Sequence, residues 1–115
     1  MLTSKEIAHL AVKALDDKLA RDIQILKTDK VTVLADYFIL CTAGNSTHGK
    51  TLADEVDKVQ AGEQPLRREG YRSGGWTLLD FGCVVVHIFS EEMRSFYSLD
   101  RLWSDAEKID YKDFL

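Results

Sequence analysis

The stretch ADYFILCTAGNSTHGKT, residues 35–51, joins an almost uninterrupted apolar run to a group of small and polar residues. An apolar run without alternation is typical of a strand that is buried on both faces of a sheet. Ser46 is a good N-cap residue, and the apolar residues after it recur at helical spacing: Leu52, Ala53, Val56 and Val59. The stretch therefore predicts a central strand at 35–43 and a helix that begins at about residue 46 and ends near Gly62.

Further elements are expected on both sides of this unit. Thr3 and Glu6 form a capping box for an N-terminal helix, whose apolar stripe consists of Ile7, Leu10, Ala11, Ala14 and Leu15. Alternating or apolar runs predict strands at 22–28, 66–70 (a short edge strand), 76–81 and 83–89, and a last helix from Ser90. The order α-β-β-α-β-β-β-α predicts an α/β domain bordering on α+β, with a mixed sheet of about five strands and three helices and room for one parallel crossover.

Length, charge and cysteine content limit the class of protein. A chain of 115 residues is long enough for one domain. Its net charge of −4 argues against nucleic-acid phosphate as the main partner, because nucleic-acid-binding domains usually carry a basic excess. No stretch is apolar enough to span a bilayer, and the N-terminal sequence has the features of neither a signal peptide nor a transit peptide. Cys41 and Cys83 are expected to be reduced thiols, which suits a cytoplasmic protein.

Residues 44–51, GNSTHGKT, also fit the phosphate-binding pattern G-x-x-x-x-G-K-[ST]. The motif follows a strand and precedes a helix, as that chemistry requires. The chain is too short for the long βα series of a nucleotide hydrolase, and an N-cap at Ser46 places Gly49 inside the helix, with Lys50 in solvent on its first turn. A helix start is therefore the favoured interpretation, and a small nucleotide-binding protein remains the alternative.

Other catalytic or metal-binding patterns are sparse. His9, His48 and His87 do not have metal-ligand spacing, and neither cysteine belongs to a C-x-x-C pair. A satisfied, neutral histidine is the favoured interpretation for His87, which lies in an apolar strand, and a catalytic histidine is the alternative. The basic cluster of Arg67, Arg68 and Arg72 is interpreted as a solvated edge rather than a phosphate site. We expect a non-enzymatic protein without a cofactor or metal.

The hairpin at 76–89 is the most informative region for binding. A turn at Phe81–Gly82 pairs Trp76 with His87, Leu78 with Val85 and Asp80 with Cys83, and places these six residues on one face. The other face is aliphatic: Leu79, Val84, Val86 and Ile88. The mixed face has the composition of a partner-binding surface, although the last helix is an equally good candidate to cover it. Further apolar residues follow at Phe96, Tyr97, Leu99, Leu102 and Trp103.

The runs DYFILCTAGNS, EGYRSGGWTLLDFGCVVVHIF and EEMRSFYSLDRLW together resemble the ribosomal silencing factor family, also called Iojap-like. The resemblance covers residues 1–103 as one domain and leaves 104–115 as a C-terminal tail. It implies a mixed sheet like a nucleotidyltransferase core without a working transferase site. It further implies a translational repressor that binds the large ribosomal subunit through its fourteenth protein, blocks joining of the small subunit when nutrients are scarce, and tends to homodimerise. A ribosome-assembly factor with the same docking surface is the alternative within this class.

The resemblance also assigns individual positions. Those that match the family motifs are Asp36, Trp76, Asp80, Gly82, His87, Glu91, Glu92, Arg94, Tyr97, Leu99, Leu102 and Trp103. From these and the hairpin pattern we expect a partner-binding set of Trp76, Leu78, Asp80, His87, Tyr97, Leu99, Leu102 and Trp103. The chain departs from the family at Cys83, where an aspartate is usual, and at Gly49-Lys50-Thr51, where assorted polar residues are usual. The phosphate-loop pattern is thus explained as a variable helix start.

Overall fold

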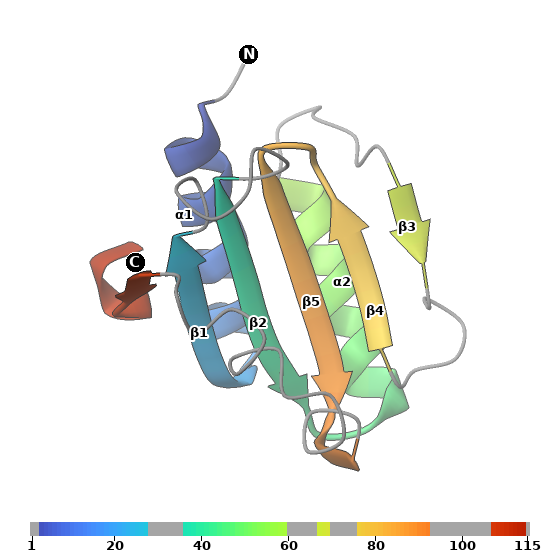
Figure 1. The fold of residues 1–115 in the computed structure, drawn as a ribbon. Coiled ribbons are helices and arrows are strands. Elements are labelled where there is room, and N and C mark those ends of the chain that lie inside the picture. The colour runs from blue at the N-terminus through green and yellow to red at the C-terminus, as the bar shows by residue number, and fades with distance from the viewer. Residues whose placement is uncertain (1–2, 28–35, 60–66, 70–75, 93–106, 115) are drawn as a thin grey trace.

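The computed structural model describes residues 3–27, 36–59, 67–69, 76–92 and 107–114 (Figure 1). Its elements in chain order are α1 (Ser4–Asp17), β1 (Arg21–Lys27), β2 (Tyr37–Ala43), α2 (Ser46–Val59), β3 (Arg67–Glu69), β4 (Trp76–Asp80), β5 (Val84–Ser90), β6 (Glu107–Ile109) and the 3-10 helix η1 (Tyr111–Phe114). The predicted order is confirmed from α1 to β5, and the mixed α/β class with it.

The strands form one sheet in the order β3-β4-β5-β2-β1-β6. β2 lies in the interior of the sheet and runs parallel to β5, from Tyr37 opposite Val84 to Ala43 opposite Ser90. The other neighbouring pairs are antiparallel. The apolar run at 35–43 is therefore confirmed as a central strand. One parallel pairing is present, but it joins β2 to β5 and not to β3, the strand that follows α2.

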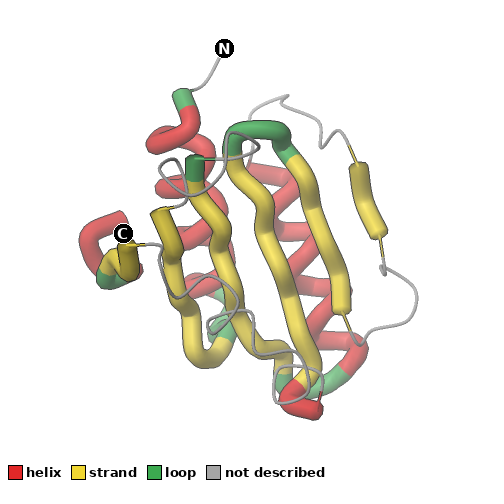
Figure 2. Tube along the Cα trace, in the orientation of Figure 1, coloured by secondary structure: helices red, strands yellow, loops and turns green. Residues whose placement is uncertain are grey.

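Both α-helices pack on the same face of the sheet, which lies behind the strands in Figures 1 and 2. The predicted capping box starts α1: the Glu6 N–H donates to Thr3 Oγ1 at 3.2 Å, and the Thr3 N–H donates to Glu6 Oε1 at 3.1 Å. No helix in the described part of the chain is long and apolar enough to cross a membrane.

The main core lies between the helices and this helix-covered face. Its strand residues are aliphatic and alternate along each strand, as the two-residue period of a strand requires. They include Ile25 of β1, Ile39 and Cys41 of β2, Leu79 of β4, and Val84, Val86 and Ile88 of β5. Leu15 of α1 and Leu52 and Val56 of α2 are fully buried against them. The predicted aliphatic layer of the hairpin is confirmed as core.

A second, smaller apolar cluster lies on the opposite face, which we call the helix-free face because no described helix packs on it (Figure 1). Leu26, Leu40 and Phe89 are fully buried there, and Phe38 and Trp76 pack against them while remaining half-buried. The sheet thus has an aliphatic face under two helices and an aromatic face without a described helix.

The C-terminal end of the chain differs from the prediction. Residues 107–109 form β6 and pair with β1, with Ile109 opposite Ile25, so the described sheet has six strands rather than five. Phe114 is buried in the main core, with its ring edge-on to Tyr37 at 5.7 Å. Assigning all of 104–115 to a tail is therefore wrong for residues 107–114. Of the predicted last helix, Glu91 and Glu92 are described and helical, whereas Ser90, its predicted start, is the last residue of β5.

Candidate partner-binding face

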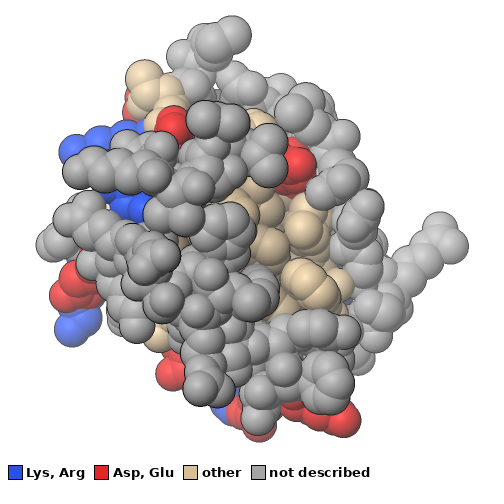
Figure 3. Space-filling model, in the orientation of Figure 1, with Lys and Arg blue, Asp and Glu red and all other residues tan. Residues whose placement is uncertain are grey.

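Four of the predicted binding residues come together on the helix-free face. Trp76, Leu78 and Asp80 alternate along β4, and His87 of β5 lies opposite Leu78. The three β4 residues are half-buried, whereas His87 is buried. Figure 3 views this face, and the described atoms near its centre belong to uncharged residues. The predicted grouping of an aromatic, a carboxylate and an imidazole is therefore present.

The other predicted binding residues, Tyr97, Leu99, Leu102 and Trp103, lie outside the described residues, as does Arg94. The structure places two further rings on this face, with Phe89 beside Trp76 and Phe38 beside His87. Neither Phe38 nor Phe89 was predicted to belong to this face. Residues two apart on a strand share a face. Phe38 therefore follows from Leu40 on β2, and Phe89 follows from His87 on β5.

The register of the hairpin differs from the predicted one by two residues. Trp76 lies opposite Phe89, not His87, and Asp80 lies opposite Val85, not Cys83. The turn residues are Gly82 and Cys83, since the Phe81 N–H donates to the Val84 carbonyl at 2.9 Å. Gly82 takes a φ of 87°, which glycine accepts without strain. A shift by an even number keeps every β4 side chain on its predicted face.

The side chain of Cys83 does not belong to the helix-free face; it packs against the main core. Its backbone has a second contact, because its carbonyl accepts hydrogen bonds from the N–H groups of Asp36 at 2.7 Å and Tyr37 at 3.2 Å. Asp80 Oδ1 accepts from the Gly82 N–H at 2.8 Å and shapes the turn. Cys83, where the resemblance led us to expect an aspartate, therefore occupies a turn position held by backbone hydrogen bonds.

His87 is the polar centre of the aromatic cluster. Trp76 donates from its indole Nε1–H to His87 Nδ1 at 3.2 Å. The His87 ring also lies 5.2 Å from Phe38 and 6.0 Å from Phe89, measured between ring centroids, and is nearly parallel to the latter. Trp76 stacks on Phe89 at 5.2 Å. These contacts hold the four rings in one arrangement, as a preorganised binding surface requires.

The hydrogen bond from Trp76 also fixes the protonation state of His87. Because Nδ1 accepts, a neutral ring carries its proton on Nε2. Burial lowers the pKa of His87 to about 4, and the nearby Asp80 carboxylate opposes this shift only in part. The predicted burial and neutrality of His87 are confirmed, but the prediction of a satisfied ring is wrong, because the buried Nε2 has no hydrogen-bond partner in the described part of the chain. A ring without charge at neutral pH can hydrogen-bond and stack, but it is a poor general acid.

The phosphate-loop pattern forms the start of α2. Asn45 is the N-cap: its Oδ1 accepts from the His48 N–H at 2.8 Å, and its carbonyl accepts from the Gly49 N–H at 2.9 Å. The Gly44 N–H donates to His48 Nδ1 at 2.8 Å. The N–H groups of Gly44, His48 and Gly49, which belong to the motif, are thus already engaged in hydrogen bonds. The predicted N-cap at Ser46 is wrong by one residue, since Asn and Ser are about equally good caps.

The remaining phosphate-loop residues have structural contacts as well. Lys50 is exposed on the first turn of the helix, and Thr51 Oγ1 donates to the Thr47 carbonyl at 3.0 Å. His48 Nε2 lies 2.7 Å from the Lys18 carbonyl, which ties the start of α2 to the end of α1. That contact joins residues thirty positions apart and has no sequence signal. The geometry favours a helix start over a nucleotide site.

Metal and thiol chemistry have little basis in the described part of the chain. No group of three or more His, Cys, Asp and Glu side chains gathers there in a metal-binding arrangement. Both cysteines are free thiols, as predicted, with Cys41 buried and Cys83 half-buried.

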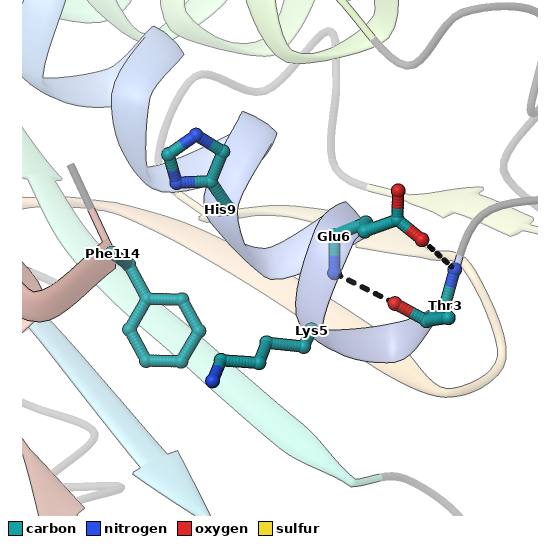
Figure 4. A pocket seen from close by; sticks show the side chains of 5 residues that line it. All are labelled: Thr3, Lys5, Glu6, His9 and Phe114. Atoms are coloured by element: carbon teal, nitrogen blue, oxygen red, sulfur yellow. Dashed lines mark hydrogen bonds between the residues drawn. The ribbon is translucent and has the colours of Figure 1, made fainter.

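A cavity of about 290 Å³ lies between the N-terminal half of α1 and η1 (Figure 4). It is lined by Thr3, Lys5, Glu6, His9 and Phe114. Glu6 and Thr3 are bonded to each other in the capping box, and the hydrogen bond from the Thr3 N–H lowers the pKa of Glu6. The Lys5 ammonium and His9 imidazole remain beside an aromatic ring. These groups do not form a nucleophile and base pair, and the cavity is separate from the helix-free face.

Comparison with known proteins identifies the family to which the chain is similar. The family model described as "Ribosomal silencing factor during starvation" matches residues 1–115, which includes the segment 104–115 that the resemblance was expected to omit. The ribosomal silencing factor of Bacillus subtilis is 38% identical over 112 residues, covering 95% of this chain and 94% of that protein. Its counterpart in Halalkalibacterium halodurans is 35% identical over 111 residues, covering 95% of each.

A solved structure supports the same assignment at the level of the fold. The crystal structure of a Chromobacterium violaceum protein matches with a TM-score of 0.86 at 36% identity, covering 90% of this chain and 88% of that chain. A family match over the whole chain, supported by these identities, shows that the chain belongs to the ribosomal silencing factor family, a family of ribosome-associated regulators of translation.

Proposed function

We propose that this protein binds the large ribosomal subunit through its helix-free face and thereby blocks joining of the small subunit. The observation that carries the proposal is the position of Trp76. It is half-buried on that face, stacks on Phe89 and donates to His87, with Leu78 and Asp80 beside it on the same strand. Tryptophan held rigidly next to polar groups is a frequent anchor of protein interfaces. On the family resemblance we propose Tyr97, Leu99, Leu102 and Trp103 as further binding residues.

The mechanism requires affinity and bulk but no reaction. A chain whose described part extends about 32 × 32 × 25 Å, seated where two subunits meet, excludes the opposing subunit sterically. We infer a non-enzymatic repressor that acts in the cytoplasm under nutrient limitation, contacts the fourteenth protein of the large subunit and is able to homodimerise. The family resemblance adds a sheet of nucleotidyltransferase-like type without transferase activity.

Sucrose-gradient sedimentation with separated ribosomal subunits tests the proposal. We expect the purified protein to comigrate with the large subunit alone and to reduce the number of joined ribosomes when both subunits are mixed. A protein that does not comigrate with the large subunit would refute the proposal. Comigration with undiminished joining would favour the assembly-factor alternative.

Lys50→Ala is a matched control for this experiment, because Lys50 is exposed on α2, away from the helix-free face. Binding to the large subunit should stay within about threefold of the unmodified protein, as for most exposed substitutions. Calorimetry should detect no specific ATP or GTP binding. Nucleotide binding that disappears in Lys50→Ala would instead support the phosphate loop.

A further inference from the structure

The turn between α1 and β1 holds a leucine in an unfavourable backbone conformation. The helix ends with the Lys18 N–H donating to Ala14, the Leu19 N–H to Asp16 and the Ala20 N–H to Leu15, at 3.2, 3.1 and 2.9 Å. This paired pattern places Leu19 at the position just after the C-cap, which is usually glycine. Leu19 has a φ of 62°, in the left-handed region that L side chains avoid.

The same residue exposes its side chain to solvent. Leu19 is 79% exposed and is the single large hydrophobic residue so exposed in the described part of the chain. Ala20, the next residue, packs against the main core. A lone exposed leucine is common, but here exposure coincides with a backbone conformation that glycine would relieve. Asp22, three residues on, also has a positive φ, of 50°. Strain that persists in this way is more frequent at functional sites than elsewhere.

Leu19 lies close to one end of a row of residues that crosses the sheet to Trp76. Arg21 pairs with Thr42, Thr42 with Phe89, and Phe89 with Trp76. These three inter-strand steps span about 14 Å. A standard interface covers about 800 Å² on each partner, a patch roughly 30 Å across. Thr42 and Phe89 in the middle of the row are buried, so a partner of that breadth would contact the two ends of the row, at Trp76 and near Leu19.

Charges around Leu19 indicate the chemistry of that partner. Asp17, Lys18 and Asp22 are exposed, and the Arg21 guanidinium is already paired with the Glu91 carboxylate. The charged groups left free at this turn are mainly acidic. We propose that Leu19 is a second anchor of the interface centred on Trp76, inserting into a small apolar pocket with a basic rim on the same protein partner. This inference rests on the proposed function.

The Leu19→Gly variant separates the role of the side chain in binding from any role in folding. Glycine relieves the positive φ, so the melting temperature should equal that of the unmodified protein or exceed it by up to about 4 °C. Affinity for the large subunit, measured by cosedimentation at fixed salt, should fall about tenfold. Leu19→Met keeps apolar volume and should retain binding. Lys13→Ala, at another exposed position of α1, is the matched control and should change neither quantity.

Three results would overturn the inference alone. One is a Leu19→Gly protein that binds like the unmodified chain while Trp76→Ala does not. Another is a lower melting temperature for Leu19→Gly, which would show that Leu19 supports the fold. The third is a change confined to self-association, measured by sedimentation equilibrium, which would identify the partner as a second copy. If the unmodified protein itself fails to bind the large subunit, the proposed function is wrong, and this inference with it.

Discussion

The two faces of the sheet are built from the same strands but have different chemistry. On β4 and β5 the helix-covered face presents Leu79 and Val86, which are fully buried beneath the helices. The helix-free face presents Trp76 and His87, which are joined by a hydrogen bond within a group of stacked rings. Neighbouring residues on a strand alternate between these environments. A single hairpin therefore contributes to folding through one set of side chains and offers a second set for binding.

The difference between the faces lies in how their contacts depend on geometry. Aliphatic burial is nondirectional and proportional to area, so the helix-covered face stabilises the fold without selecting a partner. Ring stacking and hydrogen bonds require particular orientations. The helix-free face is thus better suited to recognition. Mutations of adjacent residues on β4 should separate the two roles.

Leu79→Ala should have the largest effect. Leu79 is fully buried in the main core, and truncation of such a leucine costs about 3 kcal/mol of unfolding free energy because it leaves a cavity. Urea denaturation followed by circular dichroism measures this loss. Leu78→Ala, one residue away on the helix-free face and half-buried, is the matched control and should cost less than about 1 kcal/mol. Equal losses in the two variants would contradict the division between the faces.

Trp76→Ala should have the next largest effect, on binding rather than on stability. An anchoring tryptophan contributes about 2 kcal/mol to affinity, so binding to the large subunit should weaken roughly thirtyfold. Loss of the stacking on Phe89 should lower the melting temperature by only a few degrees. Gradient cosedimentation and thermal denaturation measure the two quantities separately.

Trp76→Phe sharpens this comparison, because it keeps an aromatic ring against Phe89 but removes the N–H that His87 accepts. Binding intermediate between that of Trp76→Ala and the unmodified protein is expected. If Trp76→Ala unfolds while Leu79→Ala is stable, the roles of the faces are reversed. If both variants fold and bind normally, the binding surface lies elsewhere, and the segment from Tyr97 to Trp103 becomes the leading candidate.

Much of this organisation could be predicted from the sequence, because periodicity determines which face a side chain occupies. The assumed turn at Phe81–Gly82 gave a register in error by two residues, yet Trp76 and Leu79 were still assigned to the correct faces. Both possible turns contain Gly82, and no local pattern distinguishes them. The same error in the turn placed Cys83 on the helix-free face, whereas its side chain packs against the main core. Cys83 is a turn residue, and turn residues do not follow strand alternation.

Features that depend on contacts between distant residues could not be predicted in this way. β6 is a strand of three residues, two of them charged, and it is recognisable only by its pairing with β1. The bridge from His48 to the Lys18 carbonyl joins two helix ends that periodicity treats separately. The positive φ of Leu19 has no sequence signal either, because glycine is the usual residue at that position.

The smallest expected effect is a dependence of stability on pH that originates at His87. Its pKa is about 4 in the folded protein, against an unfolded value near 6.5. Above pH 6.5 the ring is neutral in both states and the pH has no effect through this group. Below pH 6.5 the unfolded chain takes up a proton that the folded chain does not, so the free energy of unfolding falls as the pH is lowered towards 4. Lowering the pH from 7.5 to 5.5 should reduce the free energy of unfolding by about 1.4 kcal/mol.

The control variant His87→Gln retains an acceptor for Trp76 but does not titrate. The other histidines are common to both proteins. Urea denaturation at the two pH values should therefore show a smaller loss of unfolding free energy in the variant than in the unmodified protein. A larger loss in His87→Gln than in the unmodified protein would mean that the folded protein binds the proton more tightly than the unfolded chain, and the helix-free face would then carry a charged rather than a neutral histidine.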